Sequence, residues 1–522
     1  MEDYVMKKRL FILAACLLAA VFVFNGCGQK PAATAAAKPV KDSLVVVLNA
    51  NPAQLDPSMT NDQPSSRVMK QIYDTLLNLD DNMGPTPSLA ERWTFENDAN
   101  GQPTKLRLFL KKGVKFHNGE EFKASDVKFT LERAARSPNI AHITSMIISV
   151  DVVNDYEVLI GLPYPFAPIL NHLAHTATSM TNAKAVTEKG DTGHSQSPVG
   201  TGPMKFVNWV HGDRVELTRW DDYHGEKPRI KDLTIRIIVD PQTRILELET
   251  GGVDLVIDIT PQDIARVQAN PDLQVIRAMS LSTNYVSFNT QKPPFNDKRV
   301  RLAISHAIDS EALVKNVYMG VGSVGTGPIN GKVNYSTASS ARPIPYDPAR
   351  ARALLAEAGY PNGFATNIIL NETSQRMDTA EIVQNMLGQV GIRVDVRVIE
   401  WAAYLDMTAR GEQEMFILGW VTVTGDPDYG LHATFHTKNH GAAGNRSFYS
   451  NPALDRLLDA GRVETNTTRR AELYAQAQNI IRDEAIWTAL WFGEDVSGAR
   501  KEIKGYKLHP AGHHHLWTIY FE

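Results

Sequence analysis

Apolar and polar residues follow a regular order between residues 204 and 257. Residues 233–237 alternate apolar with polar side chains, which is the pattern of a half-buried strand. A helix is predicted over Pro241–Thr250, because Asp240 provides an N-cap, Pro241 suits the first position, and Gly251 follows the end. Further apolar runs predict strands at Met204–Trp209, Val215–Thr218 and Val253–Ile257.

A glycine-rich turn precedes this region. The run from Pro198 to Pro203 contains Gly200 and Gly202, which allow backbone conformations closed to other residues. We interpret it as a crossing of the chain between two bodies of structure.

The second half of the chain alternates predicted strands with predicted helices. Asp347-Pro348 caps a helix that ends at Gly359. After it, strand, helix, strand, helix and strand are predicted at Phe364–Leu370, Met377–Gln389, Arg393–Ile399, Ala402–Gly411 and Glu414–Leu418. Such alternation predicts a βαβ lobe, whose ligands bind at the carboxyl ends of the strands. The segment 419–431 follows the last strand and is expected at that crevice.

The remaining elements complete an α/β chain. Ser125 or Asp126 is expected to open a helix that buries Val127 and Leu131. Further elements are a strand at Ser43–Leu48, a helix from Ser65 to Leu77, a strand around Leu106–Leu110, a helix at Arg469–Ile486, and final strands that return the chain to the first lobe.

The N-terminus has the pattern of a secretory signal. Lys7-Lys8-Arg9 precedes an apolar run from Leu10 to Phe24, which is short for a membrane span. Gly26-Cys27 resembles a bacterial lipobox, and Cys27 is therefore the expected lipidation site. Cys16 fits the lipobox consensus better, but it leaves an apolar region of only about six residues. An ordinary cleaved signal or an uncleaved anchor is the alternative.

Composition narrows the possible functions. The chain has 522 residues, of which 43% are hydrophobic, so it is long enough for two or three globular domains. Its net charge of −4 provides no basic field for nucleic acid. Both cysteines lie in the signal region, which leaves the mature chain without disulfides or thiolate metal sites.

No catalytic motif stands out. HExxH, GxSxG and GxxxxGK[ST] are absent from the sequence. The GxGxxG at residues 320–325 follows a predicted helix instead of a strand, so it indicates a loop. Three histidine groups could supply metal ligands: His172 with His175, His432 with His436 and His440, and His513–His515. Packed or solvated side chains are the favoured interpretation of the first group, and Gly430 and Gly441 weaken the helix that would align the second. The last group is expected in a strand, where neighbours point to opposite faces.

Several stretches resemble one family. "PVGTGPMKFVNW" from Pro198, "KKGVKFHNGEEFKASDVKFTLERA" from Lys111 and "YPFAPILNHLAHTATSM" from Tyr164 are similar to the family 5 extracellular solute-binding proteins. These are receptors for peptides, nickel and glutathione in bacterial ABC importers, and the third stretch is most similar to the glutathione-binding branch. The resemblance implies an α/β, two-lobed periplasmic-binding-protein-like fold of type II, in the large cluster with an extra domain, whose lobes are joined by a hinge.

The resemblance also implies a division of the chain. We expect a lipoprotein signal peptide (1–27), a tether (28–42), lobe I in three parts (43–85, 204–280 and 491–522), an extra domain packed on lobe I (86–203), and a ligand-binding lobe II (281–490).

Part of the expected ligand site follows from the same resemblance, which implies that Arg376 binds a ligand carboxylate; a surface arginine is the alternative. Trp401, Trp420 and Tyr429 fall at strand ends of the βαβ lobe and are expected to clamp the solute. Peptide receptors often place an amine-binding aspartate where this chain has Val423, so either Asp426 or Asp428 takes the amine or the ligand presents none there. A capped turn around Pro427 is the other interpretation of these aspartates, and Asn445 resembles a pocket residue.

The implied function is capture of a short peptide or a peptide-like solute such as glutathione. The receptor would be lipid-anchored at the outer face of the cytoplasmic membrane or in the periplasm, and would deliver its ligand to an ABC permease without cofactor or catalysis. The alternatives are a nickel or metal-chelate receptor, an enzyme, and a surface chaperone or adhesin.

Overall fold

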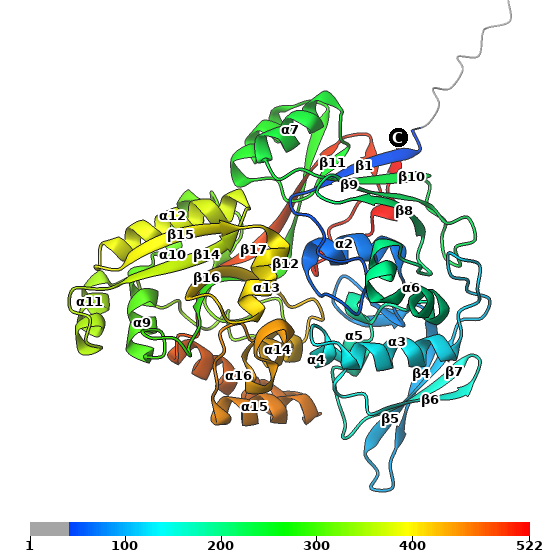
Figure 1. Ribbon diagram of the computed structural model, residues 1–522, viewed down its shortest axis with the longest axis horizontal. Helices are drawn as coiled ribbons and strands as arrows, with labels where there is room; N and C mark the ends of the chain where they lie inside the picture. Colours follow the sequence, from blue (N-terminus) through cyan, green and yellow to red (C-terminus); the bar gives the residue numbers. More distant parts are fainter. Residues whose placement is uncertain (1–40) are drawn as a thin grey trace, which may run out of the picture. The chain divides into compact units, whose positions relative to one another are not determined.

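One mixed sheet of eleven strands runs through the larger part of the protein. The computed structural model describes residues 41–522 (Figure 1), so the expected signal peptide with Cys27, and Cys16, lie outside the described residues. The strand order is β15-β14-β16-β12-β17-β11-β1-β10-β9-β8, with β13 beside β17.

The first lobe holds the half of the sheet that contains β1. Its strands are β1 (Ser43–Leu48), β8 (Met204–Val210), β9 (Arg214–Arg219), β10 (Asp232–Ile237) and β11 (Leu255–Val256). Its helices are α2 (Gln63–Ile72), α7 (Pro241–Thr250) and α8 (Ile264–Ala269), and a small C-terminal pair is formed by β18 (Ile503–Lys504) and β19 (Tyr520–Phe521). The prediction for α7 is confirmed, since the Asp240 carboxylate accepts the Thr243 N–H at 2.7 Å and Gly251 has a left-handed φ of 79°.

Two long antiparallel strands connect the lobes. β12 (Leu273–Phe288) and β17 (Trp487–Arg500) pair along almost their whole length, with a register shift between Met279 and Thr283. Near one end β17 pairs with β11, and near the other β12 pairs with β16. The expected boundaries at residues 280 and 490 therefore fall inside continuous strands.

The second lobe contains the predicted βαβ arrangement. The strands β14 (Ala365–Asn371), β15 (Arg393–Ile399) and β16 (Met415–Val421) are parallel, as the alternating pattern predicts. The helices are α9 (Lys298–Ala307), α10 (Ser310–Asn316), α11 (Pro348–Glu357), α12 (Ser374–Gly388), α13 (Trp401–Ala409), α14 (Ala433–Phe435), α15 (Pro452–Val463) and α16 (Thr467–Asp483), and β13 is Ser323–Val324. Apolar side chains of α9 to α12 and of the sheet form one core.

A separate four-stranded sheet lies between β1 and β8 in the sequence. Its order is β4 (Ala90–Asn97), β5 (Pro103–Leu110), β7 (Glu157–Gly161) and β6 (Ser149–Asn154), next to the β2–β3 pair (Leu77–Leu79, Pro85–Pro87). The helices of this part are α3 (Ala124–Arg136), α4 (Ala141–Thr144), α5 (Ile169–His172) and α6 (Ala183–Gln196). The predicted opening of α3 at Ser125 or Asp126 is wrong by two to three residues: Lys123 is the N-cap, and the Asp126 carboxylate accepts the Lys123 N–H at 3.0 Å.

The glycine-rich turn packs directly on α2. A Cβ on Gly200 would lie 2.1 Å from the Ile72 carbonyl oxygen, and one on Gly202 would lie 2.6 Å from the Ile72 carbonyl carbon. The buried His117 holds the turn through its ring Nε2, 2.9 Å from the Gly202 carbonyl oxygen. The two glycines are thus required by a close approach of backbones, and His117 is a packing residue.

Candidate functional site

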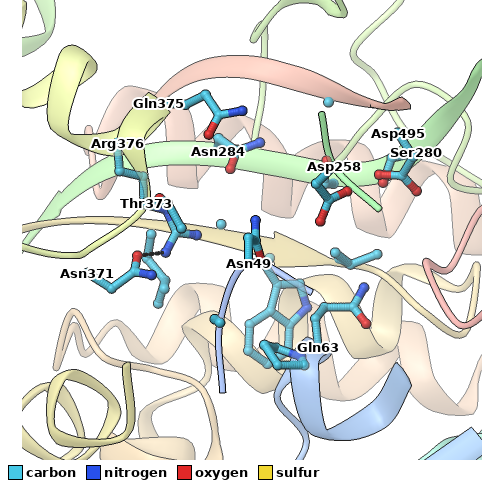
Figure 2. Close-up of a pocket in the computed structure, with 18 of the residues that line it drawn as sticks. Asn49, Gln63, Asp258, Ser280, Asn284, Asn371, Thr373, Gln375, Arg376 and Asp495 are labelled. Atoms are coloured by element: carbon cyan, nitrogen blue, oxygen red, sulfur yellow. Dashed lines mark hydrogen bonds between the residues drawn. The ribbon is translucent and has the colours of Figure 1, made fainter. Parts of the chain in front are cut away.

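A cavity of about 310 Å³ lies between the two lobes and the β12–β17 pair (Figure 2). Its walls come from the loop after β1, the start of α2, the end of β11, both long strands, the start of α12 and the segment after β16. This volume is in the range of sites for small organic ligands.

Side chains of the two long strands form one wall of the cavity. Ser280, Ser282 and Asn284 line the cavity from β12, since every second residue of a strand points to the same side. Gly493 of β17 leaves room for this wall, because a Cβ there would lie 2.1 Å from the Ser282 hydroxyl oxygen.

Arg376 lies in the first turn of α12 and lines the cavity. Its guanidinium donates to the Asn371 side-chain oxygen and lies 5.7 Å from the centre of the Trp401 ring. Within residues 41–522 the structure shows no salt bridge to it, and burial lowers the pKa of Arg376. Thr373 makes no side-chain cap at the adjacent helix N-terminus. A helix start and an unpaired guanidinium together suit an anionic ligand group.

The predicted aromatic residues lie together at the same cavity. Trp401, Trp420 and Tyr429 all line it, and the rings of Trp420 and Tyr429 are 5.1 Å apart. Trp401 and Tyr429 also contact the first lobe: the Trp401 Nε1–H donates to Asp62 at 3.1 Å, and the Asn61 amide donates to the Tyr429 hydroxyl at 3.5 Å. The two lobes therefore touch across the cavity.

Asp426, Asp428 and Asn445 lie elsewhere. Arg470 donates to both carboxylate oxygens of Asp426, at 2.7 and 2.8 Å, and Arg462 binds Asp428 at 2.8 and 3.0 Å. The Asn445 amide donates to the Tyr449 carbonyl at 2.9 Å. None of the three lines the cavity, and the two ion pairs instead hold the segment that carries Tyr429.

The cavity also contains acidic residues that the sequence analysis did not single out. Asp258 follows β11 with a left-handed φ of 62°, and it is paired with Arg67 at 2.6 Å. Asp495 belongs to β17, and Figure 2 shows both carboxylates near Ser280, away from Arg376. Asp258 could have been suggested by its place at the carboxyl end of a strand. Asp495 gives no comparable signal, because its neighbours in the sequence are those of an ordinary strand.

Burial and the neighbouring Asp258 raise the pKa of Asp495 to about 7. The pKa of Asp258 is lowered, since its ion pair with Arg67 outweighs the effect of burial. The two carboxyl groups thus share one guanidinium, and the structure disfavours a second full negative charge between them.

The histidine groups lie outside the cavity lining. His432 and His436 have ring centres 4.5 Å apart and, with Asp459, form the one group of potential metal ligands found within residues 41–522. Arg462 lies 3.2 Å from His432 Nε2, so a cation already occupies the vicinity of that nitrogen. His172 and His175 are buried, and His513–His515 lies in a loop, so the strand expected there is wrong.

Comparison with known proteins gives a consistent result. The sequence profile of the bacterial extracellular solute-binding proteins, family 5, matches residues 84–442. The glutathione-binding protein GsiB of Salmonella choleraesuis is 33% identical over 479 residues, covering 90% of this chain and 92% of GsiB. The GsiB protein of Pectobacterium atrosepticum is also 33% identical, over 482 residues.

Solved structures show the same fold. The periplasmic binding protein DppA of Helicobacter pylori, in complex with the peptide STSA, superposes with a TM-score of 0.87 at 29% identity. That match covers 92% of this chain and 98% of DppA. A dipeptide-binding protein from Pseudoalteromonas, in complex with Met-Leu, has a TM-score of 0.86 at 25% identity, covering 92% of this chain and 100% of its own.

Proposed function

Because this chain belongs to the bacterial extracellular solute-binding proteins of family 5, we propose that it captures short peptides, or a peptide-like solute such as glutathione, for an ABC importer. The observation that carries this proposal is the cavity between the lobes, with the unpaired Arg376 at one end and two acidic residues at the other. A peptide carries a carboxylate and usually an amine, and its middle part suits the aromatic side chains of Trp420 and Tyr429.

We further propose that the site residues are Arg376, Trp401, Trp420 and Tyr429. Arg376 supports this role because a guanidinium binds a carboxylate through two parallel hydrogen bonds. Asp426, Asp428 and Asn445 are not retained as ligand residues, since their polar atoms already bind protein groups.

The proposed mechanism is hinge closure. The register shift between Met279 and Thr283 interrupts the strand pair that joins the lobes, and such irregularities bend strands. A ligand held by both lobes favours the closed arrangement, in which Asp62 meets Trp401 and Asn61 meets Tyr429. The role is binding and delivery to a permease, without a chemical step.

Closure is expected to compact the protein when ligand binds. Small-angle X-ray scattering of the protein alone and saturated with glutathione or a tripeptide measures this directly. We expect a smaller radius of gyration in the complex, because the lobes swing together over the ligand. An unchanged radius in a saturated complex contradicts the hinge mechanism, while binding itself is measured separately by calorimetry.

We propose that Cys27 carries the lipid that anchors the receptor to the cell envelope. No helix within residues 41–522 is long and apolar enough to cross a membrane. Cys27→Ser is expected to abolish labelling by palmitate and to remove the protein from the detergent phase. Equal labelling of the wild type and the variant, or lipid found on Cys16, contradicts this assignment.

A further inference from the structure

The carboxyl groups that line the cavity differ in the hydrogen bonds and ion pairs that they already form within the protein. Four are present: Asp62, Asp258, Glu494 and Asp495. Arg277 donates to both oxygens of Glu494 at 2.8 Å. Asp62 accepts hydrogen bonds from the Ser65 N–H, the Trp401 indole and the Thr60 hydroxyl, at 3.1, 3.1 and 2.7 Å. These two groups have little capacity left for a ligand.

Asp258 and Asp495 differ from these two groups, because both of them interact with the same guanidinium, that of Arg67. Arg67 binds Asp258 at 2.6 Å, and within the described chain Asp495 has no salt bridge. Arg67 attracts Asp495 only from a greater distance, while Asp258 repels it. Arg244 also acts on Asp258, but neither guanidinium forms a salt bridge with Asp495, which is therefore the carboxyl group at this end that lacks a directly paired cation within the described chain.

We propose that Asp258 and Asp495 bind the ammonium group of the ligand, and that the ligand is a zwitterion of about tripeptide length whose carboxylate meets Arg376. This inference rests on the proposed function and deepens it. It assigns the amine to the first lobe and the long strand β17, in place of the segment that carries Asp426 and Asp428.

The spacing along β12 supports the proposed length. Ser280 interacts with Asp495 at one end, while Asn284 and Arg376 both lie against Gly419 at the other, within 2.6 and 3.5 Å of the position of a Cβ there. Four residues of extended strand rise about 13 Å, and less across the bulge. An extended tripeptide spans about 10–11 Å, and a hydrogen bond at each end adds to this. A dipeptide, at about 7 Å, does not reach both ends.

The raised pKa of Asp495 also supports a role as partner of the ligand ammonium. Burial and Asp258 together raise this pKa to about 7, because Arg67 and Ser280 offset only part of their effect. A ligand ammonium offsets the rest, because an opposite charge within a few ångströms favours the ionised carboxylate.

Calorimetric titration with acetylated and free probes tests the assignment. The probes are glutathione, N-acetylglutathione, trialanine and N-acetyltrialanine, each titrated into the wild type, Asp495→Asn and Glu494→Gln. Asp495 is chosen over Asp258 because Asp258→Asn would break the partly buried ion pair with Arg67. Glu494→Gln removes the same charge one residue away on β17, so it controls for the long-range field.

In the wild type we expect N-acetylation to weaken binding by roughly 10- to 100-fold, the effect of one charge-assisted hydrogen bond. In Asp495→Asn the free and acetylated probes are expected to bind within about threefold of each other. In Glu494→Gln the penalty is expected to stay as in the wild type. Circular dichroism and the urea midpoint check that the variants are folded.

The outcomes separate two kinds of failure. A wild type that binds free and acetylated probes equally well, or an acetylation penalty that persists in Asp495→Asn, overturns the assignment of the amine. A penalty that is lost equally in Glu494→Gln also overturns it, since the effect is then one of overall charge. A wild type that binds none of the four probes overturns the proposed function itself.

Discussion

Replacing Arg376 by alanine is expected to weaken the binding of glutathione or a tripeptide by about 1.5–3 kcal/mol. The guanidinium lies at the start of α12 with no salt bridge inside the described chain, so the ligand carboxylate is its natural partner. Calorimetry or fluorescence of the neighbouring Trp401 measures the loss.

Two further variants test whether the loss of affinity is specific to the guanidinium of Arg376. Arg376→Lys is expected to recover only part of the affinity, because an ammonium cannot form the two parallel bonds of a guanidinium. Arg393→Ala removes an exposed arginine of the same lobe and is expected to leave binding unchanged. Wild-type affinity in Arg376→Ala would mean that this arginine does not contact the ligand.

Asp428→Asn is expected to destabilise the protein by about 3–5 kcal/mol, the usual effect of removing one partner from a buried ion pair. Arg462 and Asp428 are each only 1% exposed in their side chains, so the variant leaves a guanidinium buried without its counter-charge. Urea unfolding measures the change. The exposed pair of Asp395 and Arg397 provides the control, and Asp395→Asn is expected to shift the midpoint little.

The same ion pair predicts a dependence of stability on pH. Burial acts to raise the pKa of Asp428, but Arg462 and His172 outweigh it and hold that pKa well below its ordinary value of 3.8. Because the folded pKa is lowered, the stabilisation is complete above the ordinary carboxyl pKa and is lost progressively as the pH falls below it. The difference in stability between wild type and Asp428→Asn should therefore shrink below about pH 4. A difference that does not change with pH would show that Asp428 does not act through its charge.

Local sequence patterns were sufficient to predict many of the helices and strands. The cap at Asp240, the proline after it and Gly251 define α7 within one segment, and the alternation of β15 predicted its bounds of Arg393–Ile399 correctly. The helix expected from Ser65 to Leu77 was too long, because the chain leaves the helix at Tyr73 and Leu77 already begins β2.

The site was only partly predictable, for a physical reason. The roles of Asp426 and Asp428 depend on Arg470 and Arg462, which are 44 and 34 residues away in the sequence. Asp258 meets Arg67 across 191 residues, and Asp495 is brought to them by a strand that begins only at Trp487. No local pattern in the sequence indicates such long-range partners. Arg376 was expected from the family resemblance and the three aromatic residues from their places near strand ends, and all four line the cavity.

The pairing of β12 with β17 bears on how specificity could change in evolution. Ser287 and Trp487 are opposite one another in this pair, so the chain between them leaves β12 and returns to β17 at one place. Paired residues of an antiparallel ladder have Cα atoms about 5 Å apart. Residues 288–486 thus form an insertion with adjacent ends, which recombination between related genes could exchange as a cassette. Such an exchange would replace Arg376 and the aromatic side chains while it left Asp258 and Asp495 in place, and new receptors could arise by altering the recognition of one ligand end at a time.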